Sequence, residues 1–320
     1  MLNINFNIVQ IGCGYWGTNL AKTFNRLGSL SHLCDENIKL AKKLAIEINP
    51  NLEIIDPKAL ESLDEVDAAS IATPANTHFE IARTCLKKGW HVYIEKPITL
   101  VASEAEELIN CAKESNLKIQ AGHLLLYHPA VERMHELIAN NKIGDIRYIY
   151  SNRISYGKIR TFENVAWSFM PHDISLILYF AQSELNSMDF KASSVFSPNN
   201  LDTAHLWLNF SNGIRSHIFA SWSNPFKEHK LVIIGQTGSL IFEDSVEKNK
   251  LTYIDYKIDL DEHDMPLLSD LSIRENINIK SERPLDNACK DFIDSCKSDK
   301  EPLASVENAL EVVRILENTN

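Results

Sequence analysis

The sequence predicts two domains: an α/β domain built on a doubly wound parallel sheet, then an α+β domain with a large, mostly antiparallel sheet. Three observations support this. The length of 320 residues suggests about two domains. Strand and helix patterns alternate up to about residue 122, and long strand-like runs follow. We therefore expect one domain at residues 1–122 and a second at 123–320, whose C-terminal helix is able to pack back on the first.

In the first domain, short apolar runs alternate with amphipathic segments. Glycines at 28 and 89 are placed to end two of the helices, and Ser103 with Glu106 forms a capping box at the start of another. Strands are expected at, among others, Ile4–Ile11, Leu30–Cys34, Ala68–Ala72, His91–Ile94 and Lys118–Ala121. Helices are expected at Tyr15–Leu27, Glu36–Ile48, Thr77–Lys88 and 103–115. Six strands separated by such helices indicate a parallel sheet.

The second domain begins with a helix near Pro129–Asn140 and continues with strands separated by turns such as Ser211-Asn212-Gly213. We expect strands at Ile146–Tyr156, Thr203–Phe210, Ile214–Trp222, Lys230–Ile234, Ser239–Phe242 and Leu251–Tyr256. We expect further helices at Pro171–Phe180, Asn287–Cys296 and Val306–Glu317.

Composition excludes several classes of function. The net charge of −11 has no accompanying basic stripe, which argues against nucleic acid and polyanionic surfaces as partners. No apolar run approaches the roughly 20 residues needed to span a bilayer, and the N-terminus is not that of a signal peptide. Six scattered cysteines without a metal-binding pattern favour reduced thiols. We expect a soluble cytoplasmic protein with no metal site.

A glycine-rich turn follows the first strand, and it reads Gly12-Cys13-Gly14-Tyr15-Trp16-Gly17. Gly12 permits a tight turn, Gly14 lets a pyrophosphate approach the backbone, and Gly17 lets the helix pack on the strand. The alternative is a purely structural glycine turn. Asp35 ends the second strand, where a carboxylate accepts hydrogen bonds from the adenosine ribose and repels a 2′-phosphate. This favours NAD, although Asp35 is also placed to cap the next helix.

Two further clusters follow later strands of the sheet, at the edge where ligands of open α/β folds bind. In the first cluster, Thr73, Pro74 and Asn76 are expected near the nicotinamide ribose, while His78 is either a further cofactor contact or a structural histidine. In the second, Glu95-Lys96-Pro97, the lysine is suited to hold a substrate hydroxyl and the glutamate to reach the nicotinamide ribose. Taken alone, a Lys-Pro pair at a strand end is more often a surface turn.

Together these motifs, with a later histidine in Trp167-Ser168-Phe169-Met170-Pro171-His172-Asp173, resemble the Gfo/Idh/MocA oxidoreductase family over essentially the whole chain. The resemblance implies a Rossmann domain that binds NAD, with Lys96 and His172 as the catalytic pair. Pro171 is expected in the first turn of a helix, which would place His172 near its positive end and keep the imidazole a neutral base.

The chain departs from the family pattern in two places. Many members have Asp where Ser168 stands, which excludes a carboxylate there and leaves Asp173 either to orient His172 or to cap the helix. Many sugar dehydrogenases of the family have an Asn-Arg pair where this chain has two leucines at 124 and 125. Candidate substrate contacts are the side chains of His123, Tyr127 and Trp167, together with His172; the first two alternatively only pack the domain junction.

A run of three cations, Arg153, Lys158 and Arg160, lies just before the His172 segment in an otherwise acidic chain. The simple interpretation is a solvated strand edge. The alternative is a site for a phosphate-bearing substrate.

The runs GHLLLYHPA, SNRISYGKIR and FENVAWSFMPHD look like a subgroup of the family that acts on UDP-N-acetylglucosamine-type sugars. That resemblance implies oxidation at C3, followed by a PLP-dependent aminotransferase that consumes the keto sugar. It also implies a homodimer or homotetramer that pairs through the outer face of the C-terminal sheet. Two rival functions remain: a dehydrogenase for a free sugar or inositol, and a sensor that binds NAD without turnover. Retention of Lys96 and His172 counts against the sensor.

Overall fold

The structure, a computed structural model, describes residues 6–157, 159–160, 163–196, 198, 200–256, 258–263, 265–268 and 273–319. The chain divides into two compact units. The first extends to Tyr127 and also includes Arg283–Asn318, while the second comprises His128–Glu282. Residues 123–127, which we expected in the second domain, thus belong to the first unit. Two C-terminal helices also belong to it, whereas we expected one helix to pack there.

The first unit contains a six-stranded parallel sheet in the order β3-β2-β1-β4-β5-β6. Its strands are β1 (Ile8–Ile11), β2 (Leu30–Cys34), β3 (Glu53–Ile55), β4 (Ala68–Ile71), β5 (His91–Ile94) and β6 (Ile119–Ala121). Residues 4 and 5 of the predicted first strand lie outside the described residues. Because the strand order reverses between β1 and β4, the turns after these two strands flank the crevice where such sheets bind ligands.

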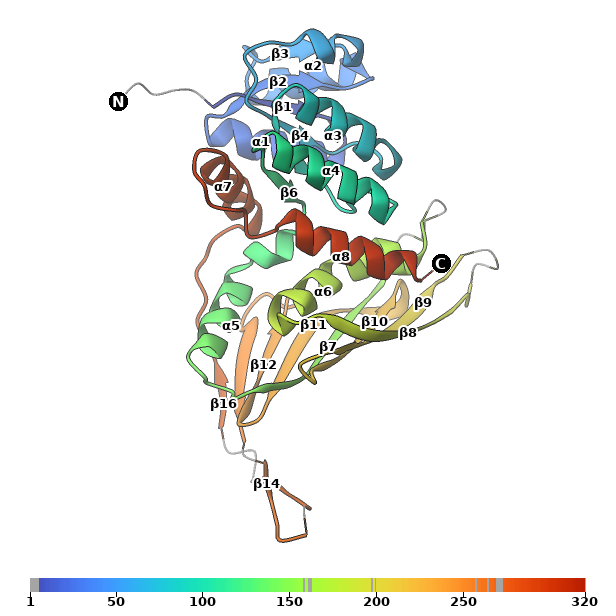
Figure 1. Ribbon diagram of the computed structural model, residues 1–320, viewed down its shortest axis with the longest axis vertical. Coiled ribbons are helices and arrows are strands. Elements are labelled where there is room, and N and C mark those ends of the chain that lie inside the picture. Colours follow the sequence, from blue (N-terminus) through green and yellow to red (C-terminus); the bar gives the residue numbers. More distant parts are fainter. Residues whose placement is uncertain are drawn as a thin grey trace. The chain divides into compact units, whose positions relative to one another are not determined.

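Helices cover both faces of this sheet (Figure 1). The α-helices are α1 (Tyr15–Arg26), α2 (Ile38–Ile48), α3 (His78–Lys87), α4 (Ala102–Glu114), α7 (Pro284–Cys296) and α8 (Val306–Glu317). Short 3-10 helices are η1 (Pro57–Ser62), η2 (Ala75–Thr77) and η3 (Leu124–Tyr127). The cores on the two faces contain α1, α2 and α7 in one case and α3, α4 and α8 in the other.

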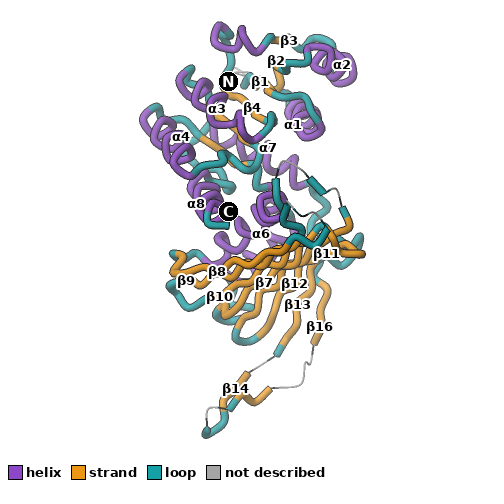
Figure 2. Tube along the Cα trace, turned by 90° about the vertical axis from the view of Figure 1, so that its right-hand side faces the viewer, coloured by secondary structure: helices purple, strands orange, loops and turns teal. Residues whose placement is uncertain are grey.

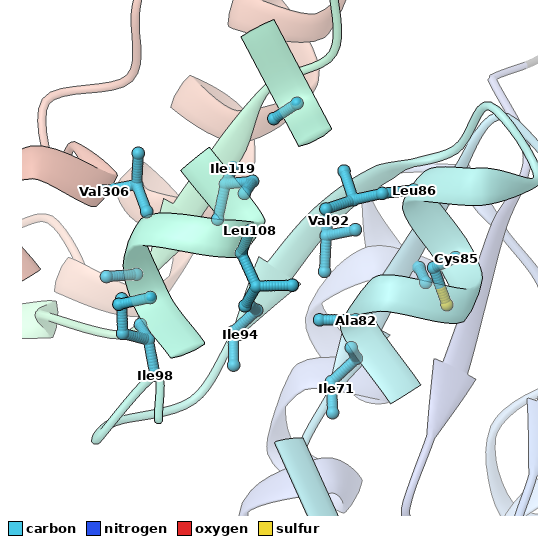
Figure 3. Close-up of a cluster of buried hydrophobic side chains, with 14 of the residues drawn as sticks. Ile71, Ala82, Cys85, Leu86, Val92, Ile94, Ile98, Leu108, Ile119 and Val306 are labelled. Atoms are coloured by element: carbon cyan, nitrogen blue, oxygen red, sulfur yellow. The ribbon is translucent and has the colours of Figure 1, made fainter. Parts of the chain in front are cut away.

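The two C-terminal helices belong to the first unit because their apolar faces complete its cores. On α7, Phe292 is fully buried and packs edge-to-face on Phe24 and Tyr93, at ring distances of 6.3 and 5.8 Å. On α8, Val306 joins the other core with Leu108 and Ile119 (Figure 3). The amphipathic pattern predicts both helices, but it does not identify the surface that their apolar faces cover.

The second unit is built on an eight-stranded sheet in the order β16-β13-β12-β11-β7-β10-β9-β8 (Figure 2). Only β7 and β10 pair in parallel among its described neighbours. The strands are β7 (Ile146–Tyr156), β8 (Leu185–Ser193), β9 (Thr203–Phe210), β10 (Arg215–Ser221), β11 (Ser223–Gly235), β12 (Gly238–Glu243), β13 (Leu251–Asp255) and β16 (Ile273–Asn276). A separate hairpin pairs β14 (Ile258–Leu260) with β15 (Pro266–Leu268). The predicted fold class is therefore confirmed.

Two helices pack on one face of this sheet, α5 (Pro129–Ala139) and α6 (Val165–Ala181). Side chains alternate along the strands, so that Leu206 and Leu208 of β9 are fully buried while Trp207 between them is partly exposed on the other face. The polar edge strand β8 was not predicted, because its sequence LNSMDFKAS lacks a clear apolar face. No helix among the described residues is long and apolar enough to cross a lipid bilayer.

Candidate active site

The turn between β1 and α1 contains three glycines, and the physical reason for a glycine differs among the three positions. Gly12 has a φ of +86°, and a Cβ there would lie 2.6 Å from the carbonyl oxygen of Ala72. A Cβ on Gly17 would lie 1.9 Å from the carbonyl oxygen of Gly12. Packing within the chain therefore requires both glycines. A Cβ on Gly14 would meet nothing within 4 Å among the described residues, so that the fold leaves its backbone open to a ligand.

Asp35 supports this turn directly. Its Oδ2 accepts a 2.6 Å hydrogen bond from the backbone N–H of Cys13, and its Oδ1 accepts one of 2.7 Å from Asn37. Asn37, and not Asp35, caps α2. The carboxylate is thus fixed in place at the end of β2, and its remaining lone pairs are able to accept hydrogen bonds from ribose hydroxyls.

A pocket of about 320 Å³ joins Asp35 to the turn after β4. Gly12, Gly14, Thr73 and Pro74 line it, as the sequence predicted for a cofactor site. The lining residues that were not predicted as cofactor contacts are Ile11, Cys34, Glu36, Leu40, Pro57, Ala72, Thr77 and Ile81. Pro57 could have been found, because it follows β3 at the same edge of the sheet.

Other residues of the glycine turn lie differently. The Cys13 side chain is buried, and burial raises the pKa of its thiol to about 12. Tyr15 is 82% exposed and packs edge-to-face on the partly exposed Trp16, at a ring distance of 5.9 Å. Asn76 is exposed in η2.

His78 does not offer its ring to a cofactor, in contrast to one of the predicted alternatives. Its Nδ1 lies 2.8 Å from the carbonyl oxygen of Pro97, and its Nε2 lies 3.0 Å from that of Thr73. The side chain is 1% exposed. The structure therefore favours the structural interpretation of this histidine, which joins the loops after β4 and β5.

Glu95 and Lys96 lie at the carboxyl end of β5, next to Gly122 and His123 after β6. A Cβ on Gly122 would lie 2.9 Å from Oε2 of Glu95. Burial raises the pKa of Glu95 to about 7, against the opposing charge of Lys96. The peptide between Lys96 and Pro97 is cis.

His123 is the most enclosed of the predicted substrate residues, with 2% of its surface exposed. Its Nδ1 has no hydrogen-bond partner among the described residues. Burial, together with the charge of Lys96, lowers the pKa of His123 to about 3, so the ring is neutral near pH 7. A buried nitrogen in this state requires an explanation, and a bound molecule or an ordered water would supply the partner.

Tyr127 has a structural role instead. Its hydroxyl donates a 2.8 Å hydrogen bond to Asp291 and accepts one of 3.0 Å from the backbone N–H of Ala304. Both partners belong to the C-terminal segment of the first unit. This tyrosine therefore fixes the segment around α7 and is not available to a substrate hydroxyl.

In the second unit, α6 begins six residues earlier than predicted. Asn164 is its N-cap, and the Asn164 side chain accepts a 3.1 Å hydrogen bond from the backbone N–H of Trp167. Pro171 consequently lies inside the helix, and His172 lies two turns from the positive end. The expectation that the helix dipole keeps His172 neutral is therefore wrong. Trp167 and Ser168 are buried in the first turn.

Arg153 forms a buried ion pair within the second unit. Its guanidinium forms two hydrogen bonds with the Asp173 carboxylate, Nε to Oδ2 at 2.5 Å and Nη2 to Oδ1 at 3.1 Å. Ser151 also donates to Asp173. Arg153 is 8% exposed and Asp173 is 1% exposed. Asp173 therefore pairs with a cation of β7, and neither of the two roles expected for it is observed.

Arg160 and Lys158 are the other two cations of the predicted run. Arg160 forms an ion pair with Glu163, and its carbonyl oxygen accepts a hydrogen bond from Asn200. Lys158 lies outside the described residues. Carboxylates close in space, Asp173 and Glu163, therefore neutralise two of the three charges, and the phosphate-binding interpretation gains no support from Arg153 or Arg160.

Comparisons with known proteins agree with the two units. The family model "Oxidoreductase family, NAD-binding Rossmann fold" matches residues 6–123, and the GFO/IDH/MocA C-terminal domain matches residues 131–241. The first unit is thus an NAD-binding Rossmann domain.

Individual relatives have low sequence identity to this chain. The chain is 32% identical over 217 residues to the UDP-N-acetylglucosamine 3-dehydrogenase of Acidithiobacillus ferrooxidans, which is 66% of this chain and 65% of that protein, just under two thirds of its length. It is 25% identical over 256 residues to the 2,7-anhydro-N-acetylneuraminate hydratase of Escherichia coli, or 74% and 67% of the two chains.

Solved structures share the fold over almost the whole chain. The Acidithiobacillus ferrooxidans dehydrogenase superposes with a TM-score of 0.83, covering 98% of this chain and 96% of that one at 24% identity. A putative oxidoreductase from Magnetospirillum magnetotacticum superposes with a TM-score of 0.85, covering 99% and 100% at 26% identity.

Proposed function

The chain belongs to the Gfo/Idh/MocA oxidoreductase family, and we propose that it is an NAD-dependent dehydrogenase that oxidises a secondary hydroxyl, at C3, of a nucleotide sugar such as UDP-N-acetylglucosamine. The observation that carries this proposal is the similarity to a UDP-N-acetylglucosamine 3-dehydrogenase. The position of Lys96 supports it as well. Lys96 lies at the carboxyl edge of the Rossmann sheet, and open α/β sheets bind their ligands at that edge.

The proposed chemistry assigns a separate task to each residue. When bound, NAD accepts the hydride from the carbinol carbon. Asp35 accepts hydrogen bonds from the adenosine ribose, and the backbone at Gly14 approaches the pyrophosphate. Lys96 holds the reacting hydroxyl and stabilises the negative charge that develops on its oxygen. His172 accepts the hydroxyl proton, a role that rests on the family resemblance.

Recognition of the sugar nucleotide is proposed from resemblance and not from the basic run, because Arg153 is held by Asp173. His123 remains the best-supported substrate contact among the predicted residues. Its buried Nδ1 without a partner among the described residues is able to hydrogen-bond a hydroxyl that Lys96 also holds.

The test must allow for an unfavourable equilibrium, because oxidation of an alcohol by NAD is commonly uphill. The chain is incubated with NAD, UDP-N-acetylglucosamine, a PLP-dependent aminotransferase and an amino donor, and mass spectrometry seeks the amino sugar. The amino sugar supports the proposal. Reduction of NAD by a free sugar or inositol, with no product from the nucleotide sugar, establishes the alternative dehydrogenase. Binding of NAD without turnover of any substrate establishes the sensor.

We also propose a homodimer or homotetramer, formed through the face of the eight-stranded sheet opposite α5 and α6. Aromatic side chains gather there on β9 and β10. His205 stacks on Phe219 at a ring distance of 4.5 Å, and Trp207 stacks on His217 at 4.8 Å. A second copy of the chain would cover this aromatic patch. Light scattering tests the proposal: Trp207→Glu should lower the mass to that of a smaller species.

A further inference from the structure

His78 connects the two loops that the proposed reaction uses. It is the first residue of α3, and its ring lies between the loop of residues 73–77 and the turn that contains Lys96. Thr73, Pro74 and Thr77 of the first loop line the cofactor pocket. Pro97, whose carbonyl oxygen contacts Nδ1 of His78, directly follows Lys96.

The surroundings leave the ring little freedom. Ile98, next to Pro97, is fully buried and packs in the same core as Ala82 of α3 (Figure 3). In the other loop, the Thr77 hydroxyl lies 2.7 Å from both the Thr73 hydroxyl and the carbonyl oxygen of Pro74. Each loop thus has contacts of its own, and the imidazole is a polar connection between the two.

The chemistry of the ring makes this connection asymmetric. Both neighbours are carbonyl oxygens, which only accept hydrogen bonds, while a neutral imidazole has one N–H to donate. Burial lowers the pKa of His78, and the two carbonyl oxygens oppose that shift. In one neutral tautomer Nδ1 donates to the Lys96 turn, and in the other Nε2 donates to the cofactor loop.

We propose that His78 is a positioning residue that couples the cofactor loop to the Lys96 turn, its one N–H donating either from Nδ1 to Pro97 or from Nε2 to Thr73. The inference rests on the proposed function, because it assigns importance to the position of Lys96. It distinguishes His78 from an ordinary core histidine, whose two nitrogens would contribute only to the stability of the fold.

Two conservative variants separate the two nitrogens. The amide nitrogen of His78→Asn replaces Nδ1 and is able to donate to Pro97, whereas that of His78→Gln replaces Nε2 and is able to donate to Thr73. His78→Asn should weaken NAD binding about tenfold and change Lys96 little. His78→Gln should leave NAD binding within about threefold and reduce turnover at saturating NAD by roughly 10- to 100-fold, since Lys96 is displaced.

The measurements include two that need no substrate. Calorimetry gives the NAD affinity. Mass spectrometry follows the rate at which an amine-selective reagent labels Lys96. This labelling rate should change in His78→Gln and not in His78→Asn. His91→Gln is the matched control, because Nδ1 of His91 accepts a structural hydrogen bond from Lys118 at the opposite end of β5.

These readouts separate the two proposals. Opposite effects of the Asn and Gln variants on NAD affinity and on Lys96 labelling support the coupling, even if no nucleotide sugar is oxidised by the wild-type chain. Equal losses in both variants, or a change in thermal stability alone, would overturn it. If His78→Asn and His78→Gln both unfold, their NAD affinity and labelling at a lower temperature decide the matter, with the same expected outcomes.

Discussion

The two units each contain a cluster of buried ionisable side chains, and the clusters differ in how their polar atoms are paired. In the second unit, Arg153 and Asp173 form a bidentate ion pair. In the first, Glu95 has a raised pKa and His123 has a buried nitrogen without a partner among the described residues, both beside Lys96. A paired cluster stabilises its fold only if it stays intact, whereas an incompletely paired cluster is costly unless a ligand completes it. The difference identifies the first cluster as the better candidate for chemistry.

The largest expected effect belongs to Lys96 and His172, the proposed catalytic pair. Lys96→Ala and His172→Ala should each lower turnover of the nucleotide sugar by about two to four orders of magnitude, because each removes a group that holds or moves the reacting proton. NAD binding should survive. Steady-state kinetics in the coupled assay and calorimetry with NAD provide the measurement.

Lys113→Ala is the matched control for the lysine, since Lys113 forms an exposed ion pair with Glu307 and no other ion pair among the described residues. Its turnover should equal that of the wild type. Near-normal turnover of Lys96→Ala would remove the first cluster from the chemistry and break the comparison.

A substitution in the Arg153–Asp173 ion pair of the second unit should change the stability of the protein. Arg153→Met should lower the free energy of unfolding by about 3–5 kcal/mol, because it leaves the buried Asp173 carboxylate without its cation. Urea denaturation measures this. Arg147→Met, on the same strand but with Arg147 in an exposed ion pair, should change stability by less than about 0.5 kcal/mol. A stable Arg153→Met protein with a raised KM for the nucleotide sugar would restore the phosphate-binding interpretation.

What the sequence predicts correctly depends on the range of the interactions. The glycine turn and Asp35 lie within one strand–turn–helix segment, where each residue type has a local physical reason. The ion pair of Arg153 with Asp173 joins a strand to a helix twenty residues away, and nothing in the sequence pattern distinguishes it from a basic patch.

The predicted start of α6, at Pro171, is wrong for a local reason. Proline is common in the first turn of a helix, so Pro171 predicts a helix that begins there. The helix instead begins after Asn164, a favoured N-cap residue that directly precedes the apolar run. The error moved His172 from the interior of the helix to its end, and with it the argument from the helix dipole.

A smaller effect concerns the pH dependence of stability. The pKa of Glu95 is about 7 in the folded chain, against an ordinary value of 4.5, so the folded state binds the proton more tightly. Its contribution is therefore fully present below about pH 4.5 and is lost as the pH rises through 7. Glu95→Gln should exceed the wild type in stability by roughly 1–3 kcal/mol at pH 8, and this advantage should shrink toward pH 4.5. Urea titrations at both pH values check the sign; an advantage that grows on acidification would contradict it.

The smallest expected effect is on the choice of cofactor. Asp35 should make the chain prefer NAD to NADP, because at the end of β2 its carboxylate would repel a 2′-phosphate. Asp35→Asn should narrow that preference by about tenfold while its side-chain oxygen still accepts the hydrogen bond from Cys13. Asp35→Ala should narrow it further and weaken both cofactors, since the glycine turn loses its support as well. Fluorescence titrations of the three proteins with both cofactors separate charge repulsion from support of the turn. Tighter binding of NADP by the wild type would show that the Asp35 carboxylate supports the turn without selecting the cofactor.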